Sequence, residues 1–360
     1  MSIITRRTAI KIGGAAAALP LIGSRAFAAE KVRAAFVLIG TPDDNGWNYG
    51  HDLGRREMIE ALGADKVETT VVTNVAEGPD SERVFRELAQ QGHDIIFGTS
   101  FGYGDAMLKV AKQFPDVKFE WATGYQTAPN LSIYNARFHE GRSVLGTIAG
   151  AMSETGIGAY IGSFPIPEVV MGINAFHLAA RKQNPDFITK VVYVNSWFDP
   201  PKEADAARAL IDQGVDVITQ HTDGPAALQV AEERGIIGGF GQGADMSAFA
   251  PKAHLTSIID IWSPYYIKAV KSVIDGTWAE GSSWEGLAAG EVVIGPYNEK
   301  IPADVVAAAE AVRLGIIDGS VHPFAGPITD NEGTLRVEAG DVIDDGEFWG
   351  VDWYAQGVEA

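Results

Sequence analysis

Short apolar runs alternate with amphipathic, helix-like stretches along most of this 360-residue chain, and this alternation constrains the fold more than any other feature. The first apolar runs lie at residues 32–39, 67–75, 95–98, 118–122 and 131–136. Helical patterns separate several of them, at residues 49–62, 81–90 and 105–114. Buried strands joined by helical crossovers are typical of parallel sheets that helices cover on both faces. The sequence therefore predicts an α/β fold with parallel-sheet cores.

The same arrangement starts again in the second half of the chain. A helical pattern ends at residue 183, among apolar runs at residues 157–161, 191–196, 215–220, 236–240 and 255–259. Two segments of the first half also have echoes here: 91–96 (Gln-Gly-His-Asp-Ile-Ile) resembles 213–218, and 106–111 resembles 226–231. Chance could match two short segments, but their order and spacing also agree. We therefore expect two similar doubly wound lobes.

Residues 1–28 have the composition of an export signal rather than of a folded element. Arg6 and Arg7 precede an apolar stretch at 12–23, and Ala26-Phe27-Ala28 has the small-x-small pattern of a cleavage site. The paired arginines resemble a twin-arginine signal. The alternative is a membrane anchor, but spanning a bilayer takes about 20 apolar residues and this stretch is shorter. We expect a soluble periplasmic protein, without a lipid anchor because the chain has no cysteine.

Composition excludes several functions. A formal net charge of −19 argues against nucleic-acid binding, and zero cysteines exclude disulfides, thiol catalysis and thiolate metal sites. The sequence contains no H-E-x-x-H, G-x-S-x-G or P-loop motif, and its seven histidines are not spaced as metal ligands. We therefore expect no catalysis, no metal and no cofactor.

One motif keeps an enzyme open as an alternative. Gly239-Phe-Gly241-Gln-Gly-Ala244 satisfies the dinucleotide-binding pattern, and Asp260 follows where a ribose-binding acid could stand. The chain would then be an exported NAD(P)-dependent oxidoreductase. A helix after these glycines would be confined to residues 245–249 before Pro251, whereas a parallel crossover takes about a dozen residues. A glycine-rich loop that approaches a ligand is the favoured interpretation.

Two tryptophans occupy loops at expected strand ends, one in each half of the chain. Trp47 and Trp197 each have Asp or Asn beside them. Ligands of open α/β sheets bind at the carboxyl ends of the strands. Burial against a helix is the alternative for either indole alone. We expect these loops to be equivalent and the two indoles to hold a flat ring between them, while Asn and Asp bind its edge.

Several segments, in this order, resemble the basic-membrane-protein family of periplasmic ligand-binding proteins, which is the purine-nucleoside-receptor type of ABC importer component. The resemblance covers residues 31 to about 317 and rests on 44–48 (Asp-Asn-Gly-Trp-Asn), 135–150, 157–162, 197–203 and 255–257. It implies the type 1 periplasmic binding protein fold, in which crossing strands join two lobes that close on a small molecule. It also implies an ABC permease as partner. We expect a monomer, with lobe 1 formed by residues 29–136 plus about 256–320 and lobe 2 by 137–255 plus about 321–360.

Departures from the family pattern bear on the ligand. Gly241 stands where the family has a ribose-binding Asp, Leu38 replaces another Asp, and residues 258–260 lack the usual Lys. Loss of ribose partners beside retained aromatics favours a free purine base such as adenine. A purine nucleoside or a sugar remains the alternative ligand for the same fold.

The expected ligand-binding residues follow from these loops and from the resemblance. Trp47 and Trp197 are expected to stack on the ring, and Asn48, Asp199 and Asp223 to bind its edge. Further polar contacts and apolar lining are expected from Tyr103, Gln242, Gly241, Asn45, Phe164 and Phe198.

Overall fold

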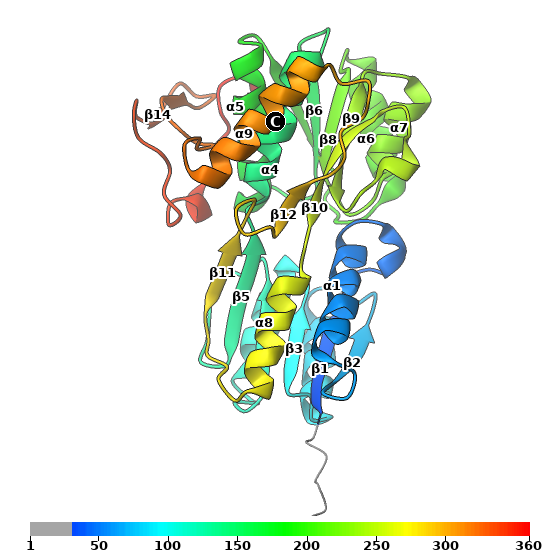
Figure 1. Ribbon diagram of the computed structural model, residues 1–360, viewed down its shortest axis with the longest axis vertical. Helices are drawn as coiled ribbons and strands as arrows, with labels where there is room; N and C mark the ends of the chain where they lie inside the picture. Colours follow the sequence, from blue (N-terminus) through cyan, green and yellow to red (C-terminus); the bar gives the residue numbers. More distant parts are fainter. Residues whose placement is uncertain (1–30) are drawn as a thin grey trace, which may run out of the picture. The chain divides into compact units, whose positions relative to one another are not determined.

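The computed structural model describes residues 31–360, which form two lobes, each built on one main sheet (Figure 1). The expected export signal at residues 1–28 lies outside the described residues. Within residues 31–360, no helix has both the length and the apolar character needed to cross a bilayer.

Lobe 1 has a six-stranded parallel sheet in the order β2-β1-β3-β4-β5-β11. Its strands are β1 (Val32–Val37), β2 (Val67–Val72), β3 (Ile95–Gly98), β4 (Lys118–Ala122), β5 (Leu131–Ala136) and β11 (Ser282–Glu285). Its helices are α1 (Trp47–Leu62), α2 (Pro79–Gln90), α3 (Gly104–Ala111) and α8 (Ser263–Ile274), with short 3-10 turns η1 (Pro42–Asp44) and η2 (Phe101–Tyr103).

Alternation along β1 explains how helices cover both faces of this sheet. Phe36 packs in the core on the side of α1 and α8, whereas Ala35 and Val37 pack on the side of α2 and α3. Successive side chains of a strand point to opposite faces, so a strand buried on both faces is continuously apolar. The helical pattern predicted at residues 49–62 corresponds to α1.

Lobe 2 has a seven-stranded sheet in the order β15-β7-β6-β8-β9-β10-β12, in which only β12 runs antiparallel to its neighbour. The strands are β6 (Ile157–Gly162), β7 (Ile188–Tyr193), β8 (Val217–His221), β9 (Gly238–Gly243), β10 (His254–Asp260), β12 (Val292–Ile294) and β15 (Val358–Glu359). The helices are α4 (Phe138–Met152), α5 (Pro167–Gln183), α6 (Pro200–Asp212), α7 (Ala226–Arg234) and α9 (Ala303–Asp318), with η3 (Ser247–Phe249) and η4 (Phe348–Gly350). A separate hairpin pairs β13 (Ile328–Thr329) with β14 (Leu335–Val337).

The two sheets repeat one topology. The order β2-β1-β3-β4-β5 in lobe 1 matches β7-β6-β8-β9-β10 in lobe 2. The sequence echo at 91–96 and 213–218 leads into β3 and β8, which are the third strands of their lobes, and the second echo lies in α3 and α7. The predicted α/β fold with two similar parallel-sheet lobes is confirmed.

The chain crosses between the lobes three times, after β5, after β10 and after β11 (Figure 1). The expected boundaries differ from this arrangement, because they placed residues 256–320 in lobe 1. Of that range, α8 and β11 belong to lobe 1, whereas β10 and β12 pair in the sheet of lobe 2 and α9 packs against α4. Strand pairing and helix packing over long sequence separations decide these assignments, and neither is visible in the local pattern.

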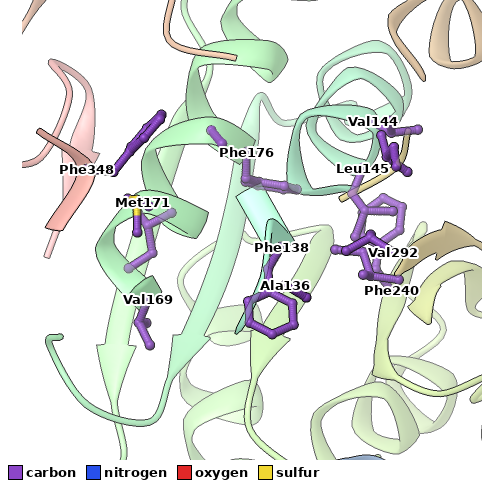
Figure 2. Close-up of a cluster of buried hydrophobic side chains, with 14 of the residues drawn as sticks. Ala136, Phe138, Val144, Leu145, Val169, Met171, Phe176, Phe240, Val292 and Phe348 are labelled. Atoms are coloured by element: carbon purple, nitrogen blue, oxygen red, sulfur yellow. The ribbon is translucent and has the colours of Figure 1, made fainter. Parts of the chain in front are cut away.

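A cluster of buried apolar side chains lies where the first crossing enters lobe 2. Figure 2 shows its members, which come from β5, α4, α5, β9, β12 and η4 and include Ala136, Phe138, Val144, Leu145, Val169, Met171, Phe176, Phe240, Val292 and Phe348. The ring of Phe138 lies 6.3 Å from that of Trp47 and 5.7 Å from that of His221, measured between centroids. This core therefore supports aromatic residues at the carboxyl ends of strands in both lobes.

Candidate functional site

A pocket lies between the lobes. Lobe 1 contributes Ile39, Trp47, Ser100, Phe101 and Thr123, and lobe 2 contributes Glu168, Trp197, His221, Thr222, Asp223, Gln242 and Gly243. These residues lie at or just beyond the carboxyl ends of β1, β3, β4, β6, β7, β8 and β9. This is the position at which open α/β sheets bind ligands.

Trp47 is held rigidly on the lobe 1 side of the pocket. It is the first residue of α1, and its Nε1 donates a 2.7 Å hydrogen bond to the carbonyl oxygen of Thr99. Its ring also packs edge-on against His51 and Trp262, which are stacked on each other with centroids 4.6 Å apart. The indole is thereby positioned before any ligand arrives.

Asn48, which follows Trp47, is used to build this loop. Its Oδ1 accepts a hydrogen bond from the Gly40 amide, and its Nδ2 donates to Asp44. Asp44 also accepts backbone amides at the start of α1, as an N-cap carboxylate does. Asn48 is buried and does not line the pocket. Of these two expected residues, the structure therefore places only Trp47 in the pocket lining.

Trp197 lines the pocket from lobe 2 and also joins the lobes. Its ring packs edge-on against Phe164, with centroids 5.1 Å apart, and its Nε1 donates a 3.3 Å hydrogen bond to Oε1 of Glu77 in lobe 1. The same Glu77 oxygen accepts hydrogen bonds from the Ser100 hydroxyl and the Gly102 amide. Glu77 thus ties Trp197 to the lobe 1 loop that carries Ser100.

The two tryptophan loops are not equivalent, which corrects the expectation from sequence. Trp47 follows β1, whereas Trp197 follows β7, the counterpart of β2. The counterpart of the Trp47 loop is the segment after β6, which contains Phe164, and the counterpart of the Trp197 loop contains Glu77. Equivalence depends on strand order, which the sequence alone did not provide.

Asp223 is an unsatisfied carboxyl group in the pocket lining. It is 7% exposed, and its Oδ2 has no hydrogen-bond partner among the described residues. Burial raises the pKa of Asp223 well above its usual value, and the nearby carboxylates of Asp44, Glu203 and Glu77 raise it further. A buried acceptor without a partner is costly, so a ligand that donates N–H groups here would relieve that cost.

Glu168 and His221 form a second polar group on the lobe 2 side. Oε2 of Glu168 accepts a 2.8 Å hydrogen bond from Asn135, and its Oε1 lies 3.4 Å from Nε2 of His221. Burial lowers the pKa of His221, with Glu168 opposing this effect. Within the described residues, no group of three or more His, Asp or Glu is arranged to hold a metal ion.

Several residues expected at the site do not line the pocket. The Tyr103 hydroxyl donates to the carbonyl oxygen of Val75 in the lobe 1 core. Asp199 caps α6 by accepting the Lys202 amide, and it also pairs with the Lys202 ammonium at 2.8 Å. Phe198 is 46% exposed. Asn45 occupies the left-handed turn before α1.

The glycine-rich segment at 239–244 is part of a strand. Residues 238–243 form β9, and only the three-residue turn η3 comes before β10, so the helix that a dinucleotide motif needs is absent from this segment. A Cβ at Gly241 would lie 2.2 Å from the Ser257 hydroxyl oxygen, so close packing requires this glycine. The segment is therefore a strand rather than the expected loop, although the last two residues of β9, Gln242 and Gly243, line the pocket. Gly241 lies outside the pocket lining, whereas Gln242 lies within it.

Sequence reasoning missed Ile39, Ser100, Phe101, Thr123, Glu168, His221, Thr222, Gly243 and the bridging Glu77. Their signal was partly available, because Tyr103 in the segment after β3 and Asp223 in the loop after β8 were expected to bind the ligand. Which residues of those segments line the pocket depends on which side chains face the other lobe. Phe101 rather than Tyr103 does so in the first of them.

The lobes touch directly beside the pocket. A Cβ at Gly46 would lie 1.9 Å from the carbonyl oxygen of Asp223, so only glycine allows this approach. Gly46 belongs to lobe 1 and Asp223 to lobe 2. The structure therefore describes the lobes closed around the pocket.

Comparison with known proteins gives consistent results. A family model described as ABC transporter substrate-binding protein PnrA-like matches residues 31–317. A purine-binding protein of Brucella abortus (strain 2308) is 54% identical over 94% of this chain and 96% of its own. A putative ABC transporter glucose-binding protein of Haloferax volcanii is 39% identical over 84% of this chain and 76% of its own.

Solved structures support the fold. An ABC transporter solute-binding protein of Aeropyrum pernix K1 superposes with a TM-score of 0.71 at 21% identity, covering 82% of this chain and 94% of that one. One from Conexibacter woesei gives a TM-score of 0.63 at 23% identity, covering 81% and 98%. The matched family consists of substrate-binding proteins rather than enzymes, so the comparisons do not support the oxidoreductase alternative.

Proposed function

Because the chain belongs to the family of PnrA-like ABC transporter substrate-binding proteins, we propose that it binds a purine base, adenine in preference, for import. The observation that carries this proposal is the unpaired Asp223 carboxyl group in a pocket to which each lobe contributes an indole. Indole surfaces stack on flat rings, and a carboxylate accepts N–H groups from a ring edge. The Brucella relative named as purine-binding supports the ligand class.

The charge of the pocket further limits which classes of ligand can bind there. Its lining residues include Glu168 and Asp223 and neither lysine nor arginine. A phosphate group would face these carboxylates without a cationic partner, which is unfavourable in a desolvated site. We therefore expect neutral, donor-rich bases to bind and nucleotides to be rejected.

A sugar is the second candidate ligand. The Haloferax relative is named as a putative glucose-binding protein, and carboxylates beside indoles also suit hydroxyl groups. The two ligand classes differ in shape, because a flat base contacts aromatic rings on both faces. A purine nucleoside combines features of both.

Mass spectrometry of the small molecule released on denaturing freshly purified protein tests the ligand class. Calorimetry with adenine, adenosine, AMP and glucose then ranks affinities. We expect adenine to bind most tightly and AMP not to bind. Release of a sugar, or a higher affinity for glucose than for adenine, would overturn the proposal.

Export and a permease partner complete the proposed function. The twin-arginine-like segment at 6–7 would direct the chain to the periplasm, where it acts as a monomer and delivers its ligand to an ABC permease. Fractionation of cells that express the chain with both arginines changed to lysine tests this route. The variant should stay in the cytoplasm, and periplasmic recovery at the normal level would contradict twin-arginine export.

A further inference from the structure

A buried arginine lies directly behind the pocket lining. Arg142, on α4, is 0% exposed. Its Nη1 donates a 2.7 Å hydrogen bond to the Thr219 hydroxyl, and its Nη2 donates to the carbonyl oxygen of Gln220 at 2.7 Å. Nη2 also donates to Oε1 of Gln242, which lines the pocket. The guanidinium group therefore connects α4 to the carboxyl ends of β8 and β9.

This contact determines how the Gln242 side chain is oriented. A guanidinium group has only donors, so the atom that it meets on Gln242 must be the amide oxygen. The Nε2 of Gln242 then points away from Arg142, and it has no hydrogen-bond partner among the described residues. Without Arg142, a half-turn of the amide would exchange the donor for the acceptor.

We propose that Arg142 is a positioning residue that makes Gln242 present an N–H donor to the ligand beside the acceptor of Asp223. This inference rests on the proposed function. The resulting pair selects a ring edge on which a hydrogen-bond acceptor lies next to an amino donor. Adenine has this pattern in its amino group, which donates, and in the adjacent ring nitrogens, which accept.

Neighbouring groups keep Arg142 suited to this role. Burial lowers the pKa of Arg142, whereas the Tyr160 phenol and the Asp260 carboxyl group favour its charged form. The guanidinium also lies over the Tyr160 ring, 5.1 Å from its centroid. A buried arginine with three hydrogen-bonded partners on two adjacent strands has little freedom to move, so the amide that it holds is fixed as well.

Deaza analogues of adenine provide the test, because each replaces one ring nitrogen acceptor by C–H. Affinities of adenine, 1-deazaadenine, 3-deazaadenine and 7-deazaadenine are measured by calorimetry for the full-length mature protein. We expect the wild type to bind at least one analogue about tenfold more weakly than adenine. In Gln242→Leu this discrimination should disappear, and in Arg142→Met it should shrink to less than about threefold.

The double variant and a matched control separate this role from a structural one. In the Gln242→Leu background, Arg142→Met should not change the adenine-to-deazaadenine ratio further. Thr219→Val removes another hydrogen bond of Arg142 without touching the Gln242 amide, and should keep the wild-type ratio. Should Arg142→Met not fold, Arg142→Gln replaces it, with the same reduction expected because an amide carries both a donor and an acceptor and can meet either end of the Gln242 side chain.

The outcomes distinguish this inference from the proposed function. Wild-type protein that binds none of the four bases contradicts the proposed function itself. Protein that binds adenine but discriminates equally in the wild type and in the folded Arg142 variant overturns the inference alone. Equal affinity of the wild type for all four bases also overturns it, since no ring acceptor would then be recognised.

Discussion

The two lobes share one strand order but supply different groups to the pocket. Lobe 1 provides Ile39, Trp47, Ser100, Phe101 and Thr123, none of which is ionisable, whereas lobe 2 provides every ionisable lining residue, namely Glu168, His221 and Asp223. The repeated sheet fixes where strand ends lie, and the loops beyond them have diverged. Surface for stacking is thus concentrated in one lobe and charged hydrogen-bonding groups in the other, although each lobe contributes one indole.

The difference also affects closure of the lobes. Asp44 and Glu77 of lobe 1 and Glu203 of lobe 2 all raise the pKa of Asp223 in lobe 2. Bringing these carboxylates together without a ligand is therefore unfavourable when they are ionised. Donors on a ligand would offset this repulsion, so we expect ligand binding to favour the closed arrangement.

The largest expected effect comes from keeping the lobes apart. Gly46→Ala would place a methyl group 1.9 Å from the Asp223 carbonyl oxygen, so the lobes could not close and the ligand would contact mainly one of them. We expect affinity for adenine, measured by calorimetry, to fall about 100-fold or more, with little change in the melting temperature of the ligand-free protein.

Gly50→Ala is the matched control for Gly46→Ala. Gly50 lies in the first turn of α1, the helix whose N-cap is Gly46, and its added Cβ would have ordinary contacts at 3.5 Å or more. Its affinity should stay within about threefold of the wild type. Equal affinities for the Gly46→Ala variant and the wild type would show that closure does not depend on this contact.

The next effect concerns the charged groups of lobe 2. Asp223→Asn removes a charged acceptor, and we expect affinity for adenine to fall about 30-fold, in line with about 2 kcal/mol for a hydrogen bond to a charged group. The same change should raise the melting temperature of the ligand-free protein at pH 8, because it removes a buried carboxylate that has no partner. Asp199→Asn, outside the pocket, should leave affinity unchanged.

A smaller effect is expected from the stacking surface of lobe 1. Trp47→Ala should lower affinity for adenine about tenfold, since stacking of a base on an aromatic side chain contributes about 1–3 kcal/mol. Trp47→Phe should retain most of the affinity while losing the hydrogen bond to Thr99. Normal binding of adenine by Trp47→Ala would contradict the conclusion that lobe 1 supplies the stacking surface of the pocket.

The smallest effect on binding is expected for Glu120, a buried carboxyl group of lobe 1 that is not part of the pocket lining. Burial raises its pKa to about 7, although hydrogen bonds from Tyr265 and Trp278 oppose this. Its pKa is thus higher in the folded than in the unfolded chain, so the stability that it contributes is present below about pH 4.5 and is lost as the pH rises through about 7. Chemical denaturation at pH 5 and pH 8 should show a smaller fall in unfolding free energy for Glu120→Gln than for the wild type. An unchanged pH dependence would assign the effect to other groups, such as Asp260, whose pKa burial raises to about 8.

Particular elements show how much of the fold and of the site could be predicted from the sequence. The runs predicted at 95–98, 118–122 and 131–136 coincide with β3, β4 and β5, because strands buried on both faces are rich in apolar residues. The loops of Trp47 and Trp197 were identified from expected strand ends, and Asp223 was expected to bind the ring edge. The structure places all three residues at one pocket. Asn48 and Asp199 could not be separated from ligand-binding residues, because the same side chains also cap helices and stabilise turns.

The local pattern of apolar and polar residues by itself determined the α/β class, the duplication and the loops that meet between the lobes. Only the tertiary structure decided which side chains in those loops serve the pocket. Glu77 and Trp197 are 120 residues apart, and Arg142 and Gln242 are 100 apart, yet each pair is joined by a hydrogen bond. Strand order and the direction of each side chain bring such partners together, and both are set by packing across the whole molecule rather than by neighbours in the chain.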